Sequence, residues 1–114
     1  MPGARFCYVE IPAREVEESA RFYERVFGWT TRERGDGALA FDDGGMVSGT
    51  WVTDREPMET PGIVAYLMVD DAEAALARVV EAGGKVVTPL GSLSEAGAAH
   101  FADPVGNVLG VYQE

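Results

Sequence analysis

Short stretches in which apolar and polar residues alternate recur along this chain, and each predicts a β-strand with one buried face. In the first stretch, residues 6–11, the side chains of Cys7, Val9 and Ile11 share one face. We expect that face, Cys7 included, to be buried against a helix. Alternation, or a short apolar run between turn residues, predicts seven more strands: residues 29–33, 38–41, 46–52, 63–69, 85–88, 98–102 and 108–112.

Two longer stretches repeat apolar residues at helical spacing. In residues 14–27, the side chains of Val16, Tyr23 and Phe27 lie on one stripe, and Gly28 supplies a stop signal. Residues 72–82 follow two aspartates, which favour a helix start, and precede two glycines, which favour a helix end. Both stretches are predicted to be amphipathic helices.

The predicted elements occur in the same order twice: one strand, one helix and three strands. Residues 53–62 separate the two halves and contain two prolines and four charged residues, which indicates an exposed linker. A duplicated order of elements predicts two modules of similar fold. We therefore expect one α+β domain over residues 1–114, built from two βαβββ modules at about 4–58 and 61–114.

Composition and charge narrow the range of partners. The 114 residues are 46% hydrophobic and 25% charged, as in a globular domain rather than a disordered chain. Nineteen acidic and nine basic side chains give a formal net charge of -10, so phosphate backbones and anionic lipid surfaces are repelled. Nucleic acid and membrane are therefore not expected partners. The negative charge itself indicates either a solvated surface or attraction of a cationic ligand.

One cysteine and one histidine restrict the chemistry further. Cys7 has no second cysteine for a disulfide, and with His100 alone it cannot build a Cys/His zinc site. No apolar stretch approaches the length of about 18 residues that a membrane span needs. We expect a cytoplasmic protein.

Four longer motifs carry a family resemblance that covers nearly the whole chain. They are Val9-Glu10-Ile11-Pro12-Ala13, Ala20-Arg21-Phe22-Tyr23-Glu24-Arg25-Val26-Phe27-Gly28-Trp29, Ala82-Gly83-Gly84-Lys85-Val86 and Phe101-Ala102-Asp103-Pro104-Val105-Gly106-Asn107. In this order and spacing the chain resembles the vicinal oxygen chelate superfamily of glyoxalases, bleomycin resistance proteins and extradiol dioxygenases. The resemblance implies two βαβββ modules whose mixed sheets curl around an open, concave cleft, with the helices outside.

The resemblance also bears on metal binding. Metal-using members of this superfamily carry a histidine on the first strand of each module and a carboxylate or amide on the last. These positions fall here on Tyr8, Tyr66 and Gly110. A neutral tyrosine is a poor ligand for a divalent ion, so we expect neither a metal ion nor another cofactor. Glu10 and His100 leave an unusual metal arrangement as the alternative.

Strand alternation selects the side chains expected to face the cleft. His100, for example, points opposite to Phe101, which we expect to face a helix. Trp51 lies on a strand without clear alternation, so it either stacks on a ligand or closes the core. Residues 103–107 are expected to form a structural turn. With Trp51 added to the residues selected by alternation, the predicted ligand-binding residues are Tyr8, Glu10, Trp51, Tyr66, Met68, His100 and Tyr112.

Three functions fit these observations. The first is a metal-independent protein of the bleomycin-resistance type that binds an aromatic or cationic small molecule. The second is a metal-dependent, glyoxalase-like lyase, isomerase or dioxygenase with an atypical site. The third is a regulatory or interaction module that has lost its pocket. In each case the resemblance implies a homodimer, because members with two modules commonly build their clefts against a second copy.

Overall fold

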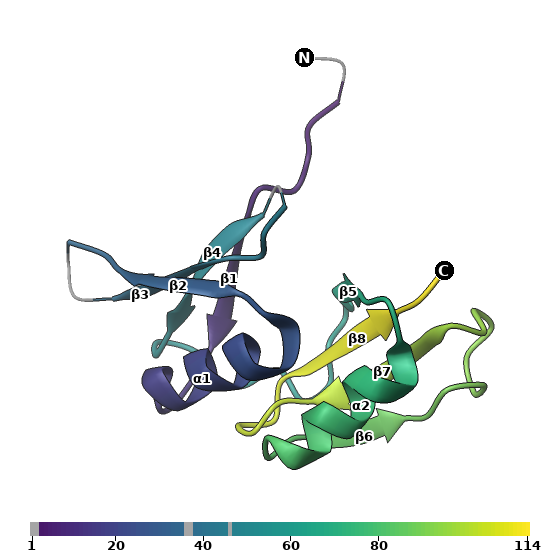
Figure 1. Cartoon of the computed structure of the whole chain (residues 1–114). Helices are drawn as coiled ribbons and strands as arrows, with labels where there is room; N and C mark the ends of the chain where they lie inside the picture. Colours follow the sequence, from purple (N-terminus) through teal and green to yellow (C-terminus); the bar gives the residue numbers. More distant parts are fainter. Residues whose placement is uncertain (1–2, 36–37, 46) are drawn as a thin grey trace.

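The computed structural model describes residues 3–35, 38–45 and 47–114, which form an α+β fold of two four-stranded mixed sheets and two helices (Figure 1). Each half of the chain has the order βαβββ, as the sequence predicts. The first sheet contains β1 (Tyr8–Pro12), β2 (Thr30–Glu33), β3 (Leu39–Asp42) and β4 (Ser48–Val52). The second contains β5 (Tyr66–Met68), β6 (Lys85–Thr88), β7 (Ala98–Ala102) and β8 (Val108–Tyr112).

The predicted strands exist, and three of them, β6, β7 and β8, have the predicted bounds. The others differ at their ends, and β5 is the most reduced, from residues 63–69 to Tyr66–Met68. Met46, the predicted first residue of the fourth strand, lies outside the described residues. The expectation that Cys7 is buried is wrong: it precedes β1, where the pairing with β4 begins at Tyr8, and its side chain is exposed.

Both sheets have the same topology. The strand orders are β1-β4-β3-β2 and β5-β8-β7-β6, and the first strand of each module pairs in parallel with the last. The remaining pairs are antiparallel. The strands β1 and β5 are therefore edge strands, each with one unpaired backbone edge in a single copy of the described chain.

The two helices end where the sequence signals them. Helix α1 (Val16–Phe27) is followed by Gly28, whose φ of 72° is the left-handed conformation that glycine adopts without strain. Helix α2 (Ala72–Glu81) is capped at its start by Asp71, whose carboxylate accepts a hydrogen bond from the backbone N–H of Ala74. Within the described part of the chain, neither helix is long and apolar enough to cross a membrane.

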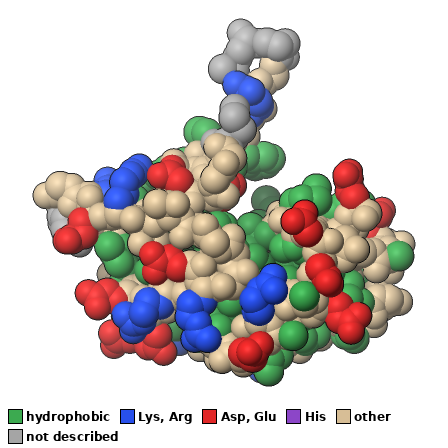
Figure 2. Space-filling model, in the orientation of Figure 1, with side chains coloured by type: hydrophobic (Ala, Val, Ile, Leu, Met, Phe, Trp, Pro, Cys, Tyr) green, Lys and Arg blue, Asp and Glu red, His purple; other side chains and the backbone are tan. Residues whose placement is uncertain are grey.

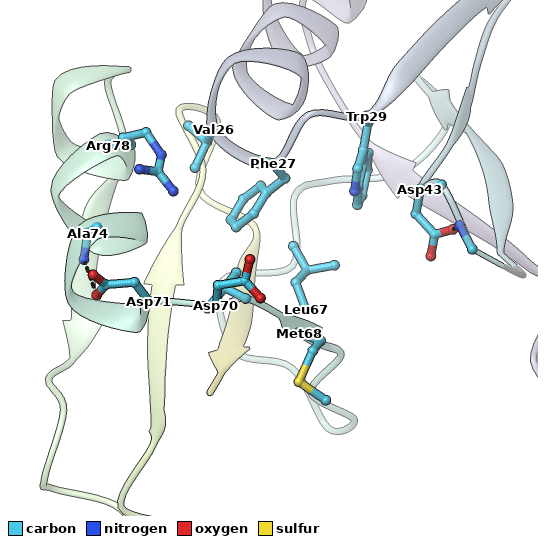
Figure 3. Close-up of a pocket in the computed structure, with 13 residues that line it drawn as sticks. Val26, Phe27, Trp29, Asp43, Leu67, Met68, Asp70, Asp71, Ala74 and Arg78 are labelled. Atoms are coloured by element: carbon cyan, nitrogen blue, oxygen red, sulfur yellow. Dashed lines mark hydrogen bonds between the residues drawn. The ribbon is translucent and has the colours of Figure 1, made fainter. Parts of the chain in front are cut away.

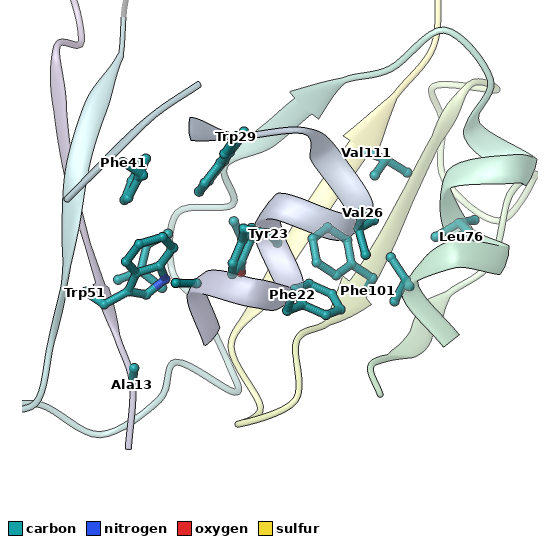
Figure 4. Close-up of a cluster of buried hydrophobic side chains, with 14 of the residues drawn as sticks. Ala13, Phe22, Tyr23, Val26, Trp29, Phe41, Trp51, Leu76, Phe101 and Val111 are labelled. Carbon is teal, nitrogen blue, oxygen red and sulfur yellow. The ribbon is translucent and has the colours of Figure 1, made fainter. Parts of the chain in front are cut away.

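Helix α1 lies between the two sheets and joins them into one core (Figure 4). On one side, Tyr23 stacks on Trp29 with ring centroids 4.6 Å apart, and Trp29 stacks on Phe41 at 4.4 Å. On the other side, the Phe22 ring lies 6.3 Å from that of Phe101 in the second sheet. The inner face of each sheet is thus directed toward the helices, and the outer face is directed away from them.

A buried hydrogen-bond cluster at the turn between β7 and β8 ties the modules together. Tyr23 on α1 donates a hydrogen bond of 2.9 Å to the Asp103 carboxylate, which also accepts from the Asn107 side chain and from three backbone N–H groups of the turn. Asn107 also donates to the Pro12 carbonyl and accepts from the Met58 N–H. The segment 103–107 therefore has the structural role that its sequence indicates.

Ionisation of this cluster is disfavoured. Burial raises the pKa of Asp103, although the hydrogen bonds from Asn107 and Tyr23 oppose the shift. Burial, followed by the charge of Asp103, raises the pKa of Tyr23 well above its ordinary value. The Tyr23 hydroxyl therefore remains a donor throughout the physiological pH range.

Candidate functional site

The outer face of the second sheet carries a row of four residues that crosses every strand. Tyr66 on β5 pairs with Gly110 on β8, Gly110 pairs with His100 on β7, and His100 pairs with Thr88 on β6. Gly110 has no side chain, and the ring of Tyr66 occupies the space above it. A Cβ added at Gly110 would overlap the Cδ2 and Cε2 carbons of that ring and would lie 3.0 Å from Cγ.

The ring of Tyr66 bridges β8 and reaches His100. The Tyr66 hydroxyl lies 2.7 Å from Nε2 of His100, and Nδ1 of His100 lies 3.1 Å from the hydroxyl of Thr88. The two rings are 5.6 Å apart between centroids. Tyr66 remains 45% exposed, so this hydrogen-bonded series of side chains is open to a ligand.

The outer face of the first sheet carries Tyr8 and Glu10, and each is paired with an arginine. Arg34 donates a hydrogen bond of 3.3 Å to the Tyr8 hydroxyl, and Arg55 donates one to the Glu10 carboxylate. Arg55 also pairs with Asp54. The bond to Glu10, followed by the bond to Asp54, raises the pKa of Arg55 above its ordinary value. The charge of Glu10 is therefore balanced within the chain.

The seven predicted site residues fall into three places. Tyr66, Met68, His100 and Tyr112 share the outer face of the second sheet, whereas Tyr8 and Glu10 lie on the first. Trp51 pairs with Ile11, is only 3% exposed, and packs against Phe41 and Tyr23 in the core. It closes the core and is not open to a ligand. Across residues 3–35, 38–45 and 47–114, no hydrogen bond or ring contact joins the groups on the two outer faces.

Sequence reasoning missed three residues of these faces. Arg34 and Arg55 lie outside the strands, where no periodicity indicates the direction of a side chain. Thr88 was missed for another reason. Strict alternation puts it on the same face as Val86, but the register shifts between these two residues and brings Thr88 opposite His100.

A pocket of about 730 Å³ lies between the end of α1 and the start of α2, and Met68 is the one predicted site residue that lines it (Figure 3). Apolar side chains such as Phe27 and Leu67 line it together with Arg78 and the carboxylates of Asp43, Asp70 and Asp71. Two of these have local structural partners: Asp71 caps α2, and Asp43 accepts hydrogen bonds from the backbone of its own turn. Asp43 and Asp71 thus have structural roles in a turn and a helix cap.

A second pocket, of about 360 Å³ and mostly apolar, lies where β1 approaches the segment leading into β5. Phe6 and Ile63, which are 88% and 81% exposed, contribute to its walls. On the face shown in Figure 2, hydrophobic side chains gather in the hollow between the two modules, and acidic side chains are distributed around it. The pocket at Phe6 and Ile63 is also lined by residues of both edge strands, Val9 and Ile11 on β1 and Tyr66 and Leu67 on β5.

The donor groups on the outer faces do not suit a divalent metal ion. The described residues contain no group of three or more His, Cys, Asp or Glu side chains that could hold one. The ring of Tyr66 fills the space above Gly110, where a carboxylate on β8 would have to stand. His100 has both ring nitrogens within hydrogen-bond distance of hydroxyl groups. These residues fit an organic ligand better than a metal.

Comparisons with known proteins agree with this fold. A sequence profile of the Glyoxalase/Bleomycin resistance protein/Dioxygenase superfamily matches residues 5–111. The anthracycline biosynthesis protein DnrV of Streptomyces peucetius is 33% identical over 99% of this chain and 48% of its own length. This chain thus spans about half the length of several curated relatives that it matches.

Two solved structures are similar over almost their whole length. TnmS3, an antibiotic binding protein from a Streptomyces species, is 28% identical with a TM-score of 0.67, over 99% of this chain and 98% of its own. A superfamily member from Sphaerobacter thermophilus is 18% identical with a TM-score of 0.80, over 100% of both chains. The second likeness concerns the fold alone.

Proposed function

This chain belongs to the Glyoxalase/Bleomycin resistance protein/Dioxygenase superfamily, and we propose that it binds a small, planar aromatic molecule without a metal ion. The observation that carries the proposal is the ring of Tyr66 lying across Gly110, with its hydroxyl held by His100. Together with Tyr112 and Met68, it gives the second sheet an outer face suited to stacking. The resemblance to an antibiotic binding protein and to anthracycline biosynthesis proteins supports an aromatic ligand.

Charge favours an uncharged aromatic ligand over a simple cation. Glu10 is the only carboxylate among the predicted site residues, and Arg55 already pairs with it. A cationic ligand would have to displace the guanidinium from Glu10 before it gained an ion pair. Because both side chains are substantially exposed, that exchange offers little net free energy.

We propose that a second copy of the chain completes the cleft. Within one copy, the two outer faces belong to separate sheets that are both directed away from the shared helix layer. Placing β1 of one copy beside β5 of another would cover two edge strands and the exposed Phe6 and Ile63. It would also bring Tyr8 and Glu10 of one copy opposite Tyr66 and His100 of the other.

Calorimetric titration of protein treated with a chelator tests the ligand proposal. With 2-methoxyanthraquinone as the planar probe, we expect one molecule bound per chain, with elemental analysis finding no metal. The variant Tyr66→Ala is expected to bind at least about fivefold more weakly, since stacking contributes ~0.5–1.5 kcal/mol beyond buried area. The variant Val80→Ala, on the exposed side of α2, is the matched control and should bind normally.

Two results would count against the proposal. Absence of binding to the metal-free protein, or binding that appears only after zinc, nickel, manganese or iron is added, would favour the metal-dependent enzyme instead. Sedimentation of the same samples tests the dimer, which predicts about twice the chain mass of 12.2 kDa at micromolar concentration. A mass near 12.2 kDa with the probe bound would contradict the composite cleft.

A further inference from the structure

The side chains of Tyr66, His100 and Thr88 form a continuous hydrogen-bonded series, in which the direction of each hydrogen bond depends on the tautomer of His100. The separation of 2.7 Å between the Tyr66 hydroxyl and Nε2 is typical of an O–H donor. The separation of 3.1 Å between Nδ1 and the Thr88 hydroxyl suits an N–H donor. A neutral imidazole has one donor and one acceptor nitrogen. Both distances are compatible with the tautomer in which Tyr66 donates to Nε2 and Nδ1–H donates to Thr88, and the relay proposed below uses that tautomer.

This arrangement leaves the oxygen of Tyr66 as an acceptor toward the open face. Its proton is directed at His100, and the ring stands over Gly110 with the hydroxyl part of an exposed side chain. A ligand that lies on this face can therefore donate a hydrogen bond to the Tyr66 oxygen, whose own proton is hydrogen-bonded to the base His100. Such a site selects a ligand with an acidic hydroxyl group.

We propose that Tyr66, His100 and Thr88 form a proton relay that binds the hydroxyl group of a phenolic aromatic ligand and accepts its proton at His100. The inference rests on the proposed function and names the ligand class of the same site. In the step, the ligand O–H bond breaks and its proton forms a new O–H bond to Tyr66. The original Tyr66 proton moves to Nε2 of His100. The ligand is then bound as a phenolate and His100 is an imidazolium.

The surroundings of His100 permit this transfer. The ionisable groups on the strands that face it are Tyr66 on β5, Tyr112 on β8 and Lys85 at the other end of β6. Over the described ranges of the chain, no ion pair involves His100. Thr88 accepts from Nδ1–H in both protonation states and thus keeps Nε2 directed at Tyr66. Thr88 is a positioning residue.

A pair of probes that differ in one group tests the relay. The first is 2-hydroxyanthraquinone, and the second is 2-methoxyanthraquinone, which has the same rings but no acidic proton. Binding of both probes to metal-free protein is measured at the same neutral pH. The absorption band of the bound hydroxy probe reports whether it is neutral or a phenolate, because the phenolate absorbs at longer wavelength.

The wild-type chain is expected to bind the hydroxy probe about five- to tenfold more tightly than the methoxy probe. One hydrogen bond accounts for a ratio of this size. Tyr66→Phe keeps the stacking surface and is expected to make the two affinities equal. His100→Gln is expected to abolish the phenolate band. Thr88→Val is expected to weaken that band, and Thr88→Ser, which restores the hydroxyl, to recover it.

The histidine itself supplies a second readout. His100 is the one histidine of the chain, so its imidazole C–H signals in a proton NMR spectrum need no assignment by mutation. The hydroxy probe is expected to move them to their protonated positions, whereas the methoxy probe is expected to shift them only by its ring current.

Two results would overturn the relay alone. The first is equal affinity of the wild type for both probes. The second is a Tyr66→Phe variant that keeps the preference for the hydroxy probe over the methoxy probe. Either result would leave the proposed function standing. If neither probe binds, the proposed function fails and the relay fails with it. Because Tyr66 is substantially exposed, circular dichroism of Tyr66→Phe is expected to match that of the wild type.

Discussion

The ring of Tyr66 lies across Gly110, its partner in the parallel pairing of β5 and β8. This position lets a side chain on the edge strand reach over β8 and bond with His100 on the next strand. A larger residue at position 110 would occupy the same space. The aromatic surface of the second sheet therefore depends on a residue that has no side chain.

Gly110→Ala is expected to displace the Tyr66 ring, break its bond with His100 and weaken binding of 2-methoxyanthraquinone at least about fivefold. Because the exposed ring can swing outward, the free energy of unfolding should fall by less than the ~1–3 kcal/mol typical of overpacking in a core. Gly62→Ala is the matched control, since an added Cβ there meets no atom within 4 Å. Calorimetry and urea unfolding give the two quantities, and wild-type affinity in Gly110→Ala would contradict the assigned role of the ring.

Tyr23→Phe removes the buried hydrogen bond between α1 and the turn at Asp103. We expect the free energy of unfolding to fall by about 1–3 kcal/mol, because one carboxylate oxygen loses a donor in a buried place. Tyr112→Phe, on the outer face, is the control and should change stability by less than about 0.5 kcal/mol. Urea unfolding measures both, and equal stability of the two variants would show that the Tyr23 bond does not hold the modules together.

The stability supplied by Asp103 is expected to depend on pH in a definite direction. Its pKa in the folded state is raised, so the folded chain binds the Asp103 proton more tightly than the unfolded chain does. The contribution is complete below the unfolded pKa of about 3.9 and is lost as the pH rises through the raised folded value. The measurement is the difference in unfolding free energy between wild type and Asp103→Asn across this range. A difference that grows with pH would mean that the hydrogen bonds outweigh burial.

Arg55→Gln is expected to free the charge of Glu10. Affinity for a cationic planar probe such as 2-aminomethylanthraquinone should then rise relative to the methoxy probe, because a ligand ammonium no longer competes with the guanidinium. Arg21→Gln, on the exposed side of α1, removes the same charge elsewhere and serves as the control. Parallel titrations measure the ratio of the two affinities, and an unchanged ratio in Arg55→Gln would show that Glu10 does not face the ligand.

Strand alternation predicts much of the architecture because one face of each strand must be buried. It places Phe101 against the helices and His100 on the opposite face, as the structure has them. The direction of the Trp51 side chain is decided only by its pairing with Ile11. A strand without clear alternation does not reveal that pairing. The shift beside Thr88 is likewise a property of two strands together. Cys7 was misplaced because the strand begins at Tyr8, two residues later than its pattern indicates.

The arrangement of the two outer faces depends on contacts between residues that are far apart in the sequence. Local sequence patterns do not reveal such contacts. Alternation groups Tyr8 and Glu10 with Tyr66 and His100, since all leave their strands on the same side. It does not say that the two sheets are separated by α1, which follows from the packing of Phe22 and Tyr23 against both. The arginine partners of Tyr8 and Glu10 lie in segments with no periodic pattern.

The central claim is that the outer face of the second sheet stacks an aromatic ligand in the absence of metal. The most direct measurement is the proton NMR spectrum of metal-free protein during titration with 2-methoxyanthraquinone, observed at the imidazole of His100. A planar ring stacked beside Tyr66 is expected to shift these signals by its ring current, with saturation at one probe per chain. Binding of the probe by calorimetry while the His100 signals stay in place, or signals that move only after a divalent metal is added, would contradict the account.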